Sequence, residues 1–325
     1  MSHPLPIQNP FVGRKHERHI YQQLLRQVTP WVLVITGDGG LGKSTLLRHL
    51  AGQTPQDIRV VLLNFANEKL RIDPLNILEE LSWKLADNCD RQRVTAFEET
   101  LKSGRDKLSK MREQLIQYVK IDSQASGKDI SFDMSVDTAA MREQRFQVRE
   151  MVTKALYAQL LTFQPAHLVL MLDTCEWLTE LEGPEVGKWV MDELLTGIHE
   201  RLAQKRRLNT VIIASRMQPL LTVIEKQDRY PLMLPRLERE AVDLYLQQVG
   251  MQDAALRQRV YDITRGHALC VSIIGALWQQ QGDHPFTLAD LPQLQTQFTE
   301  KALIEYIQER LNNRLYIIAP LSTRQ

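Results

Sequence analysis

The sequence predicts an α/β protein built on a parallel β-sheet and followed by a smaller region made only of helices. Short, continuous apolar runs such as residues 31–36 and 59–65 are typical of strands that a parallel sheet buries on both faces. Helical periodicity fills the stretch between these two runs, which gives the strand–helix–strand order of a βαβ unit. After about residue 237 only helical periodicity remains, so a separate helical region is expected there.

The composition bounds the class of protein. The chain has 325 residues, of which 43% are hydrophobic and 24% are charged, as in ordinary globular proteins with two or three domains. Its formal net charge of +1 gives no indication of nucleic-acid or membrane binding. No apolar run reaches the roughly 18 residues of a membrane span. The N-terminus lacks the basic and apolar segments of a signal peptide.

The three cysteines are far apart in the sequence and have no C-x-x-C spacing. Cys89, Cys175 and Cys270 therefore predict neither a disulfide framework nor a zinc site. This cysteine usage fits a reducing compartment, and with no signal peptide we expect a cytoplasmic protein.

One stretch matches the phosphate-binding motif G-x-x-x-x-G-K-[ST] in full. It consists of Gly37, Asp38, Gly39, Gly40, Leu41, Gly42, Lys43, Ser44 and Thr45. An expected strand precedes it and an expected helix follows it, so its backbone N–H groups and the helix dipole are expected to bind phosphate. Lys43 is expected to contact the β- and γ-phosphates and Ser44 to bind Mg²⁺. The alternative is a glycine-rich turn before a core helix.

A second motif is an apolar run that ends in a carboxylate. Residues 167–173 end in Asp173, which is typical of the Walker B strand that positions Mg²⁺. Glu176 follows at a spacing that suits a general base acting on the attacking water. The alternative is an ordinary strand end followed by an acidic turn. The apolar run at 209–216 ends in Arg216, which is expected to touch a γ-phosphate, the alternative being a surface arginine.

The remaining elements follow from hydrophobic spacing and turn residues. A short fifth strand is expected at residues 232–234. A long charged helical stretch is expected to reach about residue 120, with a polar loop at 121–140. Further helices are expected around 20–28, after the phosphate-binding loop to about 52, from 73–74 onward, at 141–161, within 177–203, at 238–249, 254–263 and 267–278, and within 287–325.

Taken together, these features resemble the nucleotide-binding module of STAND NTPases. These signal-transduction ATPases are related to AAA+ proteins and include the NB-ARC and NACHT groups. The resemblance covers roughly residues 8–310. The phosphate loop and the Walker B strand are shared with many ATPases, so they are not specific. More specific are the motif Gly13-Arg14-x-x-Glu17, the spacing of Asp173 and Glu176, and the strand ending in Ser215-Arg216.

The resemblance implies roles for residues that the motifs alone do not assign. Val12 and Gly13 would border the adenine, and Arg14 would lie near the nucleotide. Arg216 would act as the sensor of the γ-phosphate. Residues 266–269 match the Gly-x-Pro lid motif of the family, through which His267 would contact the nucleotide. Ala268 replaces the proline of that motif, so the turn is expected to be less rigid.

The resemblance also implies a domain organisation. Residues 1–30 would form an N-terminal segment with the Phe-Val-Gly-Arg motif and the first helix. Residues 31–237 would form an α/β P-loop NTPase core of the AAA+ and STAND type, with an insertion at about 68–160. Residues 238–325 would form a small all-α lid domain.

We expect the chain to be a signal-transduction NTPase that works as a nucleotide-gated switch. Binding and slow hydrolysis of ATP with Mg²⁺, giving ADP and phosphate, would control self-association or the binding of a protein partner. ATP is favoured because no Asn-Lys-x-Asp motif for guanine is present. Neither a membrane nor a nucleic acid is indicated as a partner.

Two alternatives use the same nucleotide residues. The first is an AAA+-like motor or loader, for which Arg201, Arg206 and Arg207 are candidate arginine fingers, although the near-neutral charge counts against DNA loading. The second is a non-hydrolysing nucleotide-binding module of a split system. The intact Lys43 and Glu176 make loss of hydrolysis unnecessary without excluding it.

Overall fold

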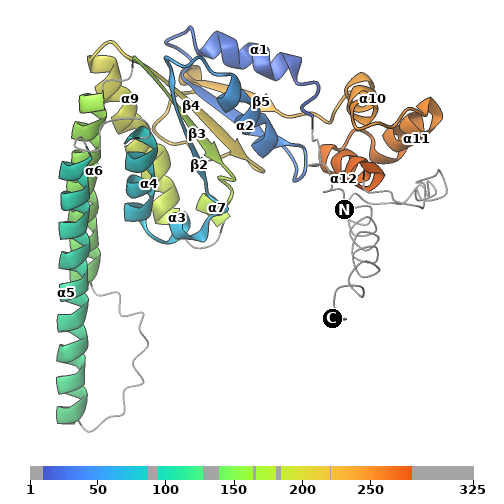
Figure 1. Cartoon of the computed structure of the whole chain (residues 1–325). Coiled ribbons are helices and arrows are strands. Elements are labelled where there is room, and N and C mark those ends of the chain that lie inside the picture. Colours follow the sequence, from blue (N-terminus) through green and yellow to red (C-terminus); the bar gives the residue numbers. More distant parts are fainter. Residues whose placement is uncertain are drawn as a thin grey trace, which may run out of the picture. The chain divides into compact units, whose positions relative to one another are not determined.

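A computed structural model describes residues 10–86, 94–126, 139–163, 166–180, 184–219 and 221–279 (Figure 1). These residues form two compact units that are each discontinuous in sequence. The first unit comprises Met1–Gln23, Ile35–Gly52 and Leu232–Gln325, and the second comprises Leu24–Val34 and Gln53–Pro231, as far as these segments are described. The domain boundaries expected from the sequence remain a prediction.

The fold contains one five-stranded parallel sheet with flanking helices, which confirms the predicted α/β class. The strand order is β2-β3-β4-β1-β5. The strands are β1 (Val32–Thr36), β2 (Arg59–Asn64), β3 (His167–Asp173), β4 (Leu208–Ser215) and β5 (Arg229–Met233). All of β3 and nearly all of β4 are buried, as their continuous apolar sequences predict.

The register of the sheet brings polar strand ends together. Asn64 of β2 pairs with Asp173 of β3, and Leu172 of β3 pairs with Ile213 of β4. Parallel strands end at a common edge, so the residues that follow β2, β3 and β4 gather there.

The second unit surrounds its strands with helices that share one apolar core. Its core side chains come from the strands and from α4, α6 and α9, and include Phe65, Leu78, Leu156 and Leu202. The helical elements of this unit are α3 (Glu68–Ile72), α4 (Pro74–Ala86), α5 (Thr95–Ser126), α6 (Ala139–Phe163), α7 (Trp177–Glu180), α8 (Pro184–Lys188), the π-helix η2 (Trp189–Leu194), α9 (Leu195–Gln204) and the short 3₁₀-helix η3 (Lys226–Asp228).

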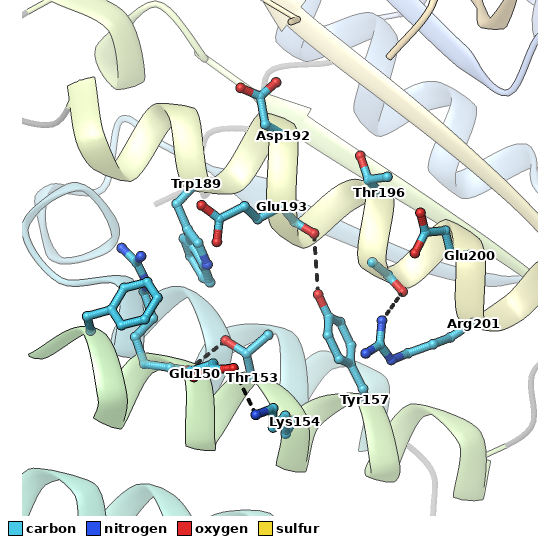
Figure 2. A pocket seen from close by; sticks show the side chains of 13 residues that line it. Glu150, Thr153, Lys154, Tyr157, Trp189, Asp192, Glu193, Thr196, Glu200 and Arg201 are labelled. Atoms are coloured by element: carbon cyan, nitrogen blue, oxygen red, sulfur yellow. Dashed lines mark hydrogen bonds and ion pairs between the residues drawn. The ribbon is translucent and has the colours of Figure 1, made fainter. Parts of the chain in front are cut away.

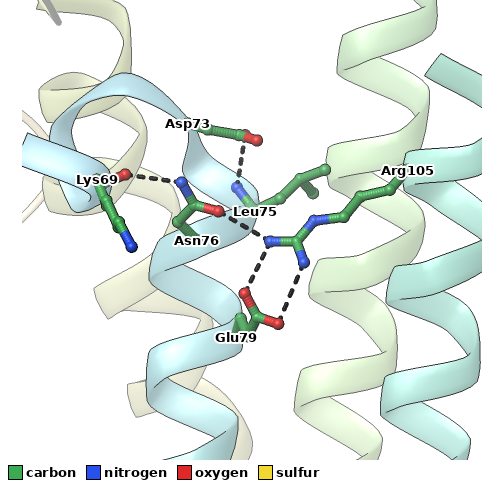
Figure 3. A network of polar contacts seen from close by, with 6 residues as sticks. All are labelled: Lys69, Asp73, Leu75, Asn76, Glu79 and Arg105. Carbon is green, nitrogen blue, oxygen red and sulfur yellow. Dashed lines mark hydrogen bonds and ion pairs between the residues drawn. The ribbon is translucent and has the colours of Figure 1, made fainter. Parts of the chain in front are cut away.

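Helices α5 and α6 follow β2 and precede β3 in the sequence, and they lie side by side as a long hairpin (Figure 1). A polar network ties α5 to α4 (Figure 3). The Arg105 guanidinium donates to both carboxylate oxygens of Glu79, at 3.1 and 2.7 Å, and to Asn76 Oδ1 at 2.8 Å. This two-pronged geometry is the strongest form of an arginine–carboxylate pair, and it fixes the base of the hairpin on α4.

The first unit has its own apolar core. It is built by α10 (Arg239–Gln248), α11 (Ala254–Thr264) and α12 (Ala268–Gln279), with Val12 of the N-terminal segment packed among them. Helix α11 begins at a capping Asp253, whose side chain accepts from the N–H groups of Ala255 and Leu256. The unit also contains most of α1 (Lys15–Leu24) and α2 (Lys43–Gln53).

Several elements differ in detail from the sequence prediction. Strand β5 begins at Arg229 and includes Pro231, which the sequence analysis placed before the strand. Proline is tolerated there because β5 is an edge strand, where one side needs no ladder donor. The π-helix at Trp189–Leu194 was not predicted. Helix α5 extends beyond the expected end to Ser126.

Part of the prediction lies outside the described residues. This holds for the helical spacing within 287–325 and for most of the loop expected at 121–140. Among the helices that the structure describes, none combines the length and the apolar character needed to cross a bilayer.

We predict that Gly197→Ala destabilises the protein by about 1–3 kcal/mol because the new methyl group overpacks the core. A Cβ at residue 197 would lie 2.2 Å from Tyr157 Oη and 2.8 Å from its Cζ, and Tyr157 is buried. The matched control is Gly52→Ala in α2, where a Cβ meets nothing within 4 Å, so its helix propensity should raise stability slightly. Urea unfolding of both variants checks this, and equal midpoints would contradict it.

Candidate functional site

The phosphate-binding loop has a backbone that its glycines make possible. Gly40 and Gly42 have φ angles of 79° and 92°, a region that other residues rarely adopt. A Cβ at Gly40 would lie only 2.5 Å from His267 Cε1, so no side chain fits at that position. Helix α2 begins at Lys43, directly after the loop, as the motif requires. The arrangement of strand, loop and helix is therefore as predicted.

Lys43 lies across its own loop. Its Nζ donates to the carbonyl of Gly37 at 2.5 Å and to that of Asp38 at 2.9 Å. A flexible lysine in this position presents a point charge at the mouth of the loop, and it can exchange carbonyl oxygens for phosphate oxygens. Ser44 occupies the first turn of α2, and its role as a Mg²⁺ ligand stays a prediction.

His267 and Leu269 contact the same loop from the turn between α11 and α12. His267 is buried, and its Nε2 lies 3.0 Å from the carbonyl oxygen of Gly39. The Leu269 N–H donates to the Gly40 carbonyl at 2.9 Å. Residues 266–269 thus lie against the phosphate-binding loop, with Ala268 as the first residue of α12. A direct contact of His267 with nucleotide stays a prediction.

Arg14 is a buried ion-pair and hydrogen-bond centre. Its guanidinium donates to Glu17 Oε1 at 3.2 Å, to the Pro235 carbonyl at 2.7 Å and to the Leu41 carbonyl at 2.7 Å. Burial lowers the pKa of Arg14 from its ordinary value, while the Glu17 carboxylate opposes that shift. The side chain that the sequence placed near the nucleotide therefore holds the loop through Leu41.

The residues that precede Arg14 are packed against other parts of the first unit. Val12 is buried in the core that α10–α12 form, and Gly13 has a φ of 68° with Ala241 too close for a larger residue. The ring of Phe11 stacks on His49 of α2, with centroids 3.6 Å apart. Sequence analysis did not single out this pair. The adenine contacts of Val12 and Gly13 stay a prediction.

The turn after β3 is strained. Asp173 is the last residue of the strand and is buried. Thr174, a β-branched residue, has a φ of 60°, where such residues are rare outliers. Strain of this kind persists where the surrounding structure holds it, which is common at functional turns. Here the Cys175 N–H donates to the Ala214 carbonyl at 3.0 Å and fixes the turn on β4.

Glu176 and Arg216, both predicted from the sequence, form a pair within the second unit. Arg216 Nε lies 3.1 Å from Glu176 Oε1, and the Arg216 backbone N–H donates to Oε2 at 3.1 Å. Only 7% of the Glu176 side chain is exposed, against 63% for Arg216. The carboxylate expected to act as general base is thus ion-paired with the residue expected to sense the γ-phosphate.

The residue between the two carboxylates takes no part in acid–base chemistry. Cys175 is fully buried, and burial together with the carboxylates of Asp173 and Glu176 raises the pKa of its thiol well above the usual range. A thiol that stays protonated is a poor nucleophile, so Cys175 serves as packing.

Asn64 is a polar neighbour of this turn that sequence analysis missed. Its Oδ1 accepts from the Thr174 hydroxyl at 3.2 Å and from the Ala66 N–H at 2.9 Å. It ends β2 in register with Asp173. A polar residue at the carboxyl end of an apolar run was the signal that could have identified it.

The loop offers groups of the kind that bind phosphate. Among the described residues there is no group of three or more His, Cys, Asp or Glu side chains that could hold a metal. Mg²⁺ commonly uses one or two protein ligands and completes its shell with phosphate oxygens and water. The loop, with its bent backbone, its lysine and the start of α2, is of the kind that binds phosphate.

A separate hollow of about 390 Å³ lies in the second unit between α6 and the η2–α9 segment (Figure 2). Of the residues singled out in the sequence, Arg201, a candidate arginine finger, lines it, and none of the predicted nucleotide or Mg²⁺ contacts does. Its polar groups are partly satisfied by one another, since Lys154 pairs with Glu150 at 2.8 Å and Tyr157 donates to the Glu193 carbonyl at 3.4 Å. We assign no nucleotide role to it.

Comparison with known proteins gives likeness of fold only. No protein-family model matches the chain, and no curated protein matches it. A STAND protein with a tetratricopeptide repeat sensor from Pyrococcus horikoshii is similar over 95% of this chain and 34% of its own, with 14% identity and a TM-score of 0.46. Drosophila ORC, in a structure bound to DNA, is similar over 98% of this chain and 66% of its own, with 12% identity and a TM-score of 0.42. The chain thus spans about a third of the first of these proteins.

We predict that Arg14→Ala lowers the free energy of unfolding by about 3 kcal/mol, because it leaves Glu17 buried without its cation. Both side chains are nearly inaccessible, with 5% and 6% exposed. The double variant with Glu17→Ala should cost less than the sum of the two single variants. Chemical denaturation measures all three, and a loss below about 0.5 kcal/mol for Arg14→Ala would show that the pair contributes little.

Proposed function

We propose that this protein is a nucleotide-gated switch that binds ATP with Mg²⁺ at the loop of residues 37–45 and hydrolyses it slowly. In this proposal the bound nucleotide controls self-association or the binding of a protein partner. The observation that carries the proposal is the conformation of the loop. Gly40 and Gly42 adopt left-handed φ angles, and α2 begins at Lys43 within the motif.

The loop residues bind and orient the phosphates in this proposal. Lys43 leaves the carbonyls of Gly37 and Asp38 and contacts the β- and γ-phosphates, because a phosphate oxygen is the more strongly charged acceptor. Ser44 and Asp173 are the proposed Mg²⁺ ligands. The ion, when bound, supplies neutralisation of charge that develops on the phosphates.

The second unit supplies the proposed base and sensor. Glu176 would accept a proton from the attacking water, which requires that its carboxylate be free to turn. The observed pair with Arg216 opposes this, since Oε1 is ion-paired with the guanidinium and Oε2 accepts from the backbone N–H of that residue. Slow hydrolysis follows if Arg216 must first exchange Glu176 for the γ-phosphate.

The same pair favours one alternative, a module that binds nucleotide without hydrolysing it. If Arg216 keeps Glu176 in every state, the loop would hold nucleotide as a structural element for a partner. No described feature favours the motor or loader, and Arg201, its first candidate finger, donates to the Gly197 carbonyl within α9 and covers the ring of Tyr157.

We predict that ADP, or a non-hydrolysable ATP analogue with Mg²⁺, raises the melting temperature by a few degrees in the wild type and not in Lys43→Ala. A ligand at 100 times its Kd stabilises the folded state by about 2.7 kcal/mol. Lys107→Ala, an exposed lysine on α5, is the matched control and should respond like the wild type. Equal shifts in Lys43→Ala and the wild type would place the nucleotide elsewhere.

Light scattering on the same samples tests the switch. Assembly with the ATP analogue alone, lost in Lys43→Ala, is the expected result. An unchanged mass in every nucleotide state would remove self-association and leave the binding of a partner as the proposed output.

We predict that Glu176→Gln lowers the single-turnover rate of ATP hydrolysis by about 100-fold, the usual contribution of a positioned general base. Nucleotide affinity should change by less than about three-fold, since the amide keeps the size of the side chain. Glu193→Gln, an exposed residue outside the proposed site, is the control. A rate near zero in both the wild type and Glu176→Gln would favour the non-hydrolysing module.

A further inference from the structure

The carbonyl groups of the phosphate-binding loop are all engaged. Lys43 contacts those of Gly37 and Asp38. Three more are held by His267, by the Leu269 N–H and by Arg14; these are the carbonyls of Gly39, Gly40 and Leu41. The Gly42 carbonyl accepts from the Leu46 N–H within α2 at 2.9 Å. Six successive peptide groups therefore have a fixed orientation.

The orientation of a carbonyl fixes the direction of the next N–H. A trans peptide is planar, and its C=O and N–H point in opposite directions. The contacts that hold the carbonyls of Gly39, Gly40 and Leu41 therefore also fix the directions of the N–H groups of Gly40, Leu41 and Gly42. In loops that bind phosphate, successive backbone N–H groups form the concavity that receives the anion, so their directions matter for affinity.

The donors that hold these three peptides do not belong to the loop. Arg14 precedes α1, whereas His267 directly precedes α12 and Leu269 is its second residue. All of them lie in the first compact unit, together with the loop. A glycine-rich segment has little conformational preference of its own, so its shape depends on these outside contacts.

The hydrogen-bond partners of the His267 imidazole make its Nε2 the donor to the Gly39 carbonyl. Its Nδ1 accepts from the Cys270 N–H at 3.4 Å, so the ring proton belongs on Nε2, which faces the Gly39 carbonyl at 3.0 Å. The ring fits only because residue 40 is glycine, where a Cβ would lie 2.5 Å from Cε1. The contact is therefore specific in both chemistry and shape.

We propose that His267 is a positioning residue, which acts on phosphate through the loop rather than by touching the nucleoside. With Leu269 it orients the peptides before and after Gly40, so that the affinity for a diphosphate depends on the docking of the α11–α12 turn. The inference rests on the proposed binding of nucleotide at the loop. It assigns His267 a different role from the direct nucleotide contact that the sequence predicted.

The test compares His267→Ala and His267→Gln with the wild type by displacement of a fluorescent ADP, using ADP and inorganic pyrophosphate as competitors. His267→Ala should weaken both competitors by the same factor of about three to ten, the effect of one lost hydrogen bond. The glutamine amide can donate to the Gly39 carbonyl, so His267→Gln should bind within about two-fold of the wild type. Equal melting temperatures of the nucleotide-free variants confirm folding.

Three results would overturn the inference. The first is unchanged affinity in His267→Ala. The second is a loss for ADP without a loss for pyrophosphate, which assigns His267 to the nucleoside. The third is a loss of affinity in His267→Gln as large as in His267→Ala, which would show that a side-chain donor to the Gly39 carbonyl is not what matters. Ser272→Ala is the matched control on α12. The Ser272 hydroxyl donates to the Leu269 carbonyl and not to the loop, so this variant should bind both competitors like the wild type.

A second variant tests the contact between residue 40 and His267 from the side of the loop. Gly40→Ala strains the loop at a φ of 79° and also pushes against His267. In the His267→Ala background the second cost disappears, so the combined loss in pyrophosphate affinity should be smaller than the product of the single losses. A combined loss equal to the product of the two single losses would contradict a contact between residue 40 and His267. Binding by Lys43→Ala equal to the wild type would instead overturn the proposed function and, with it, the inference.

Discussion

The structure of the first unit depends on one requirement, that each carbonyl of a glycine-rich loop find a donor. The loop is only partly buried and its glycines have little conformational preference, so it keeps this shape through the groups that hold its carbonyls. The donors come from Lys43 within the motif, from Arg14 before α1 and from the residues that begin α12. This requirement explains why segments far apart in the sequence form a single compact unit.

In the second unit, the order and register of the strands determine where the charged candidate residues lie. Its fully buried β3 cannot carry a charge along its length, and its only carboxylate appears at its end, where Asp173 begins a strained turn. The turn directs Glu176 to Arg216 after β4, and the two charges satisfy each other. The Glu176 carboxylate is buried whereas the Arg216 side chain is exposed, so the pair gives a buried charge a partner at the surface.

Much of the fold could be predicted because its signals are local. The runs at 31–36, 59–65 and 167–173 are mostly apolar, which is typical of strands in a parallel sheet. Strand β3 is fully buried as expected, whereas only Val61 and Leu63 of the edge strand β2 are buried. The start of strand β5 was harder to predict, since proline is rare inside strands and only the edge position of β5 makes Pro231 acceptable. The π-helix at Trp189–Leu194 has no sequence signal of comparable strength.

The sequence by itself determined the phosphate-binding loop, the order of the strands along the chain and the identity of Asp173, Glu176 and Arg216 as candidates, because each is encoded by neighbours within a few residues. Only the tertiary structure decided what Arg14, Asn64 and His267 contact. Their partners lie in other segments, and a hydrogen bond between distant segments leaves no periodicity in the sequence of either one.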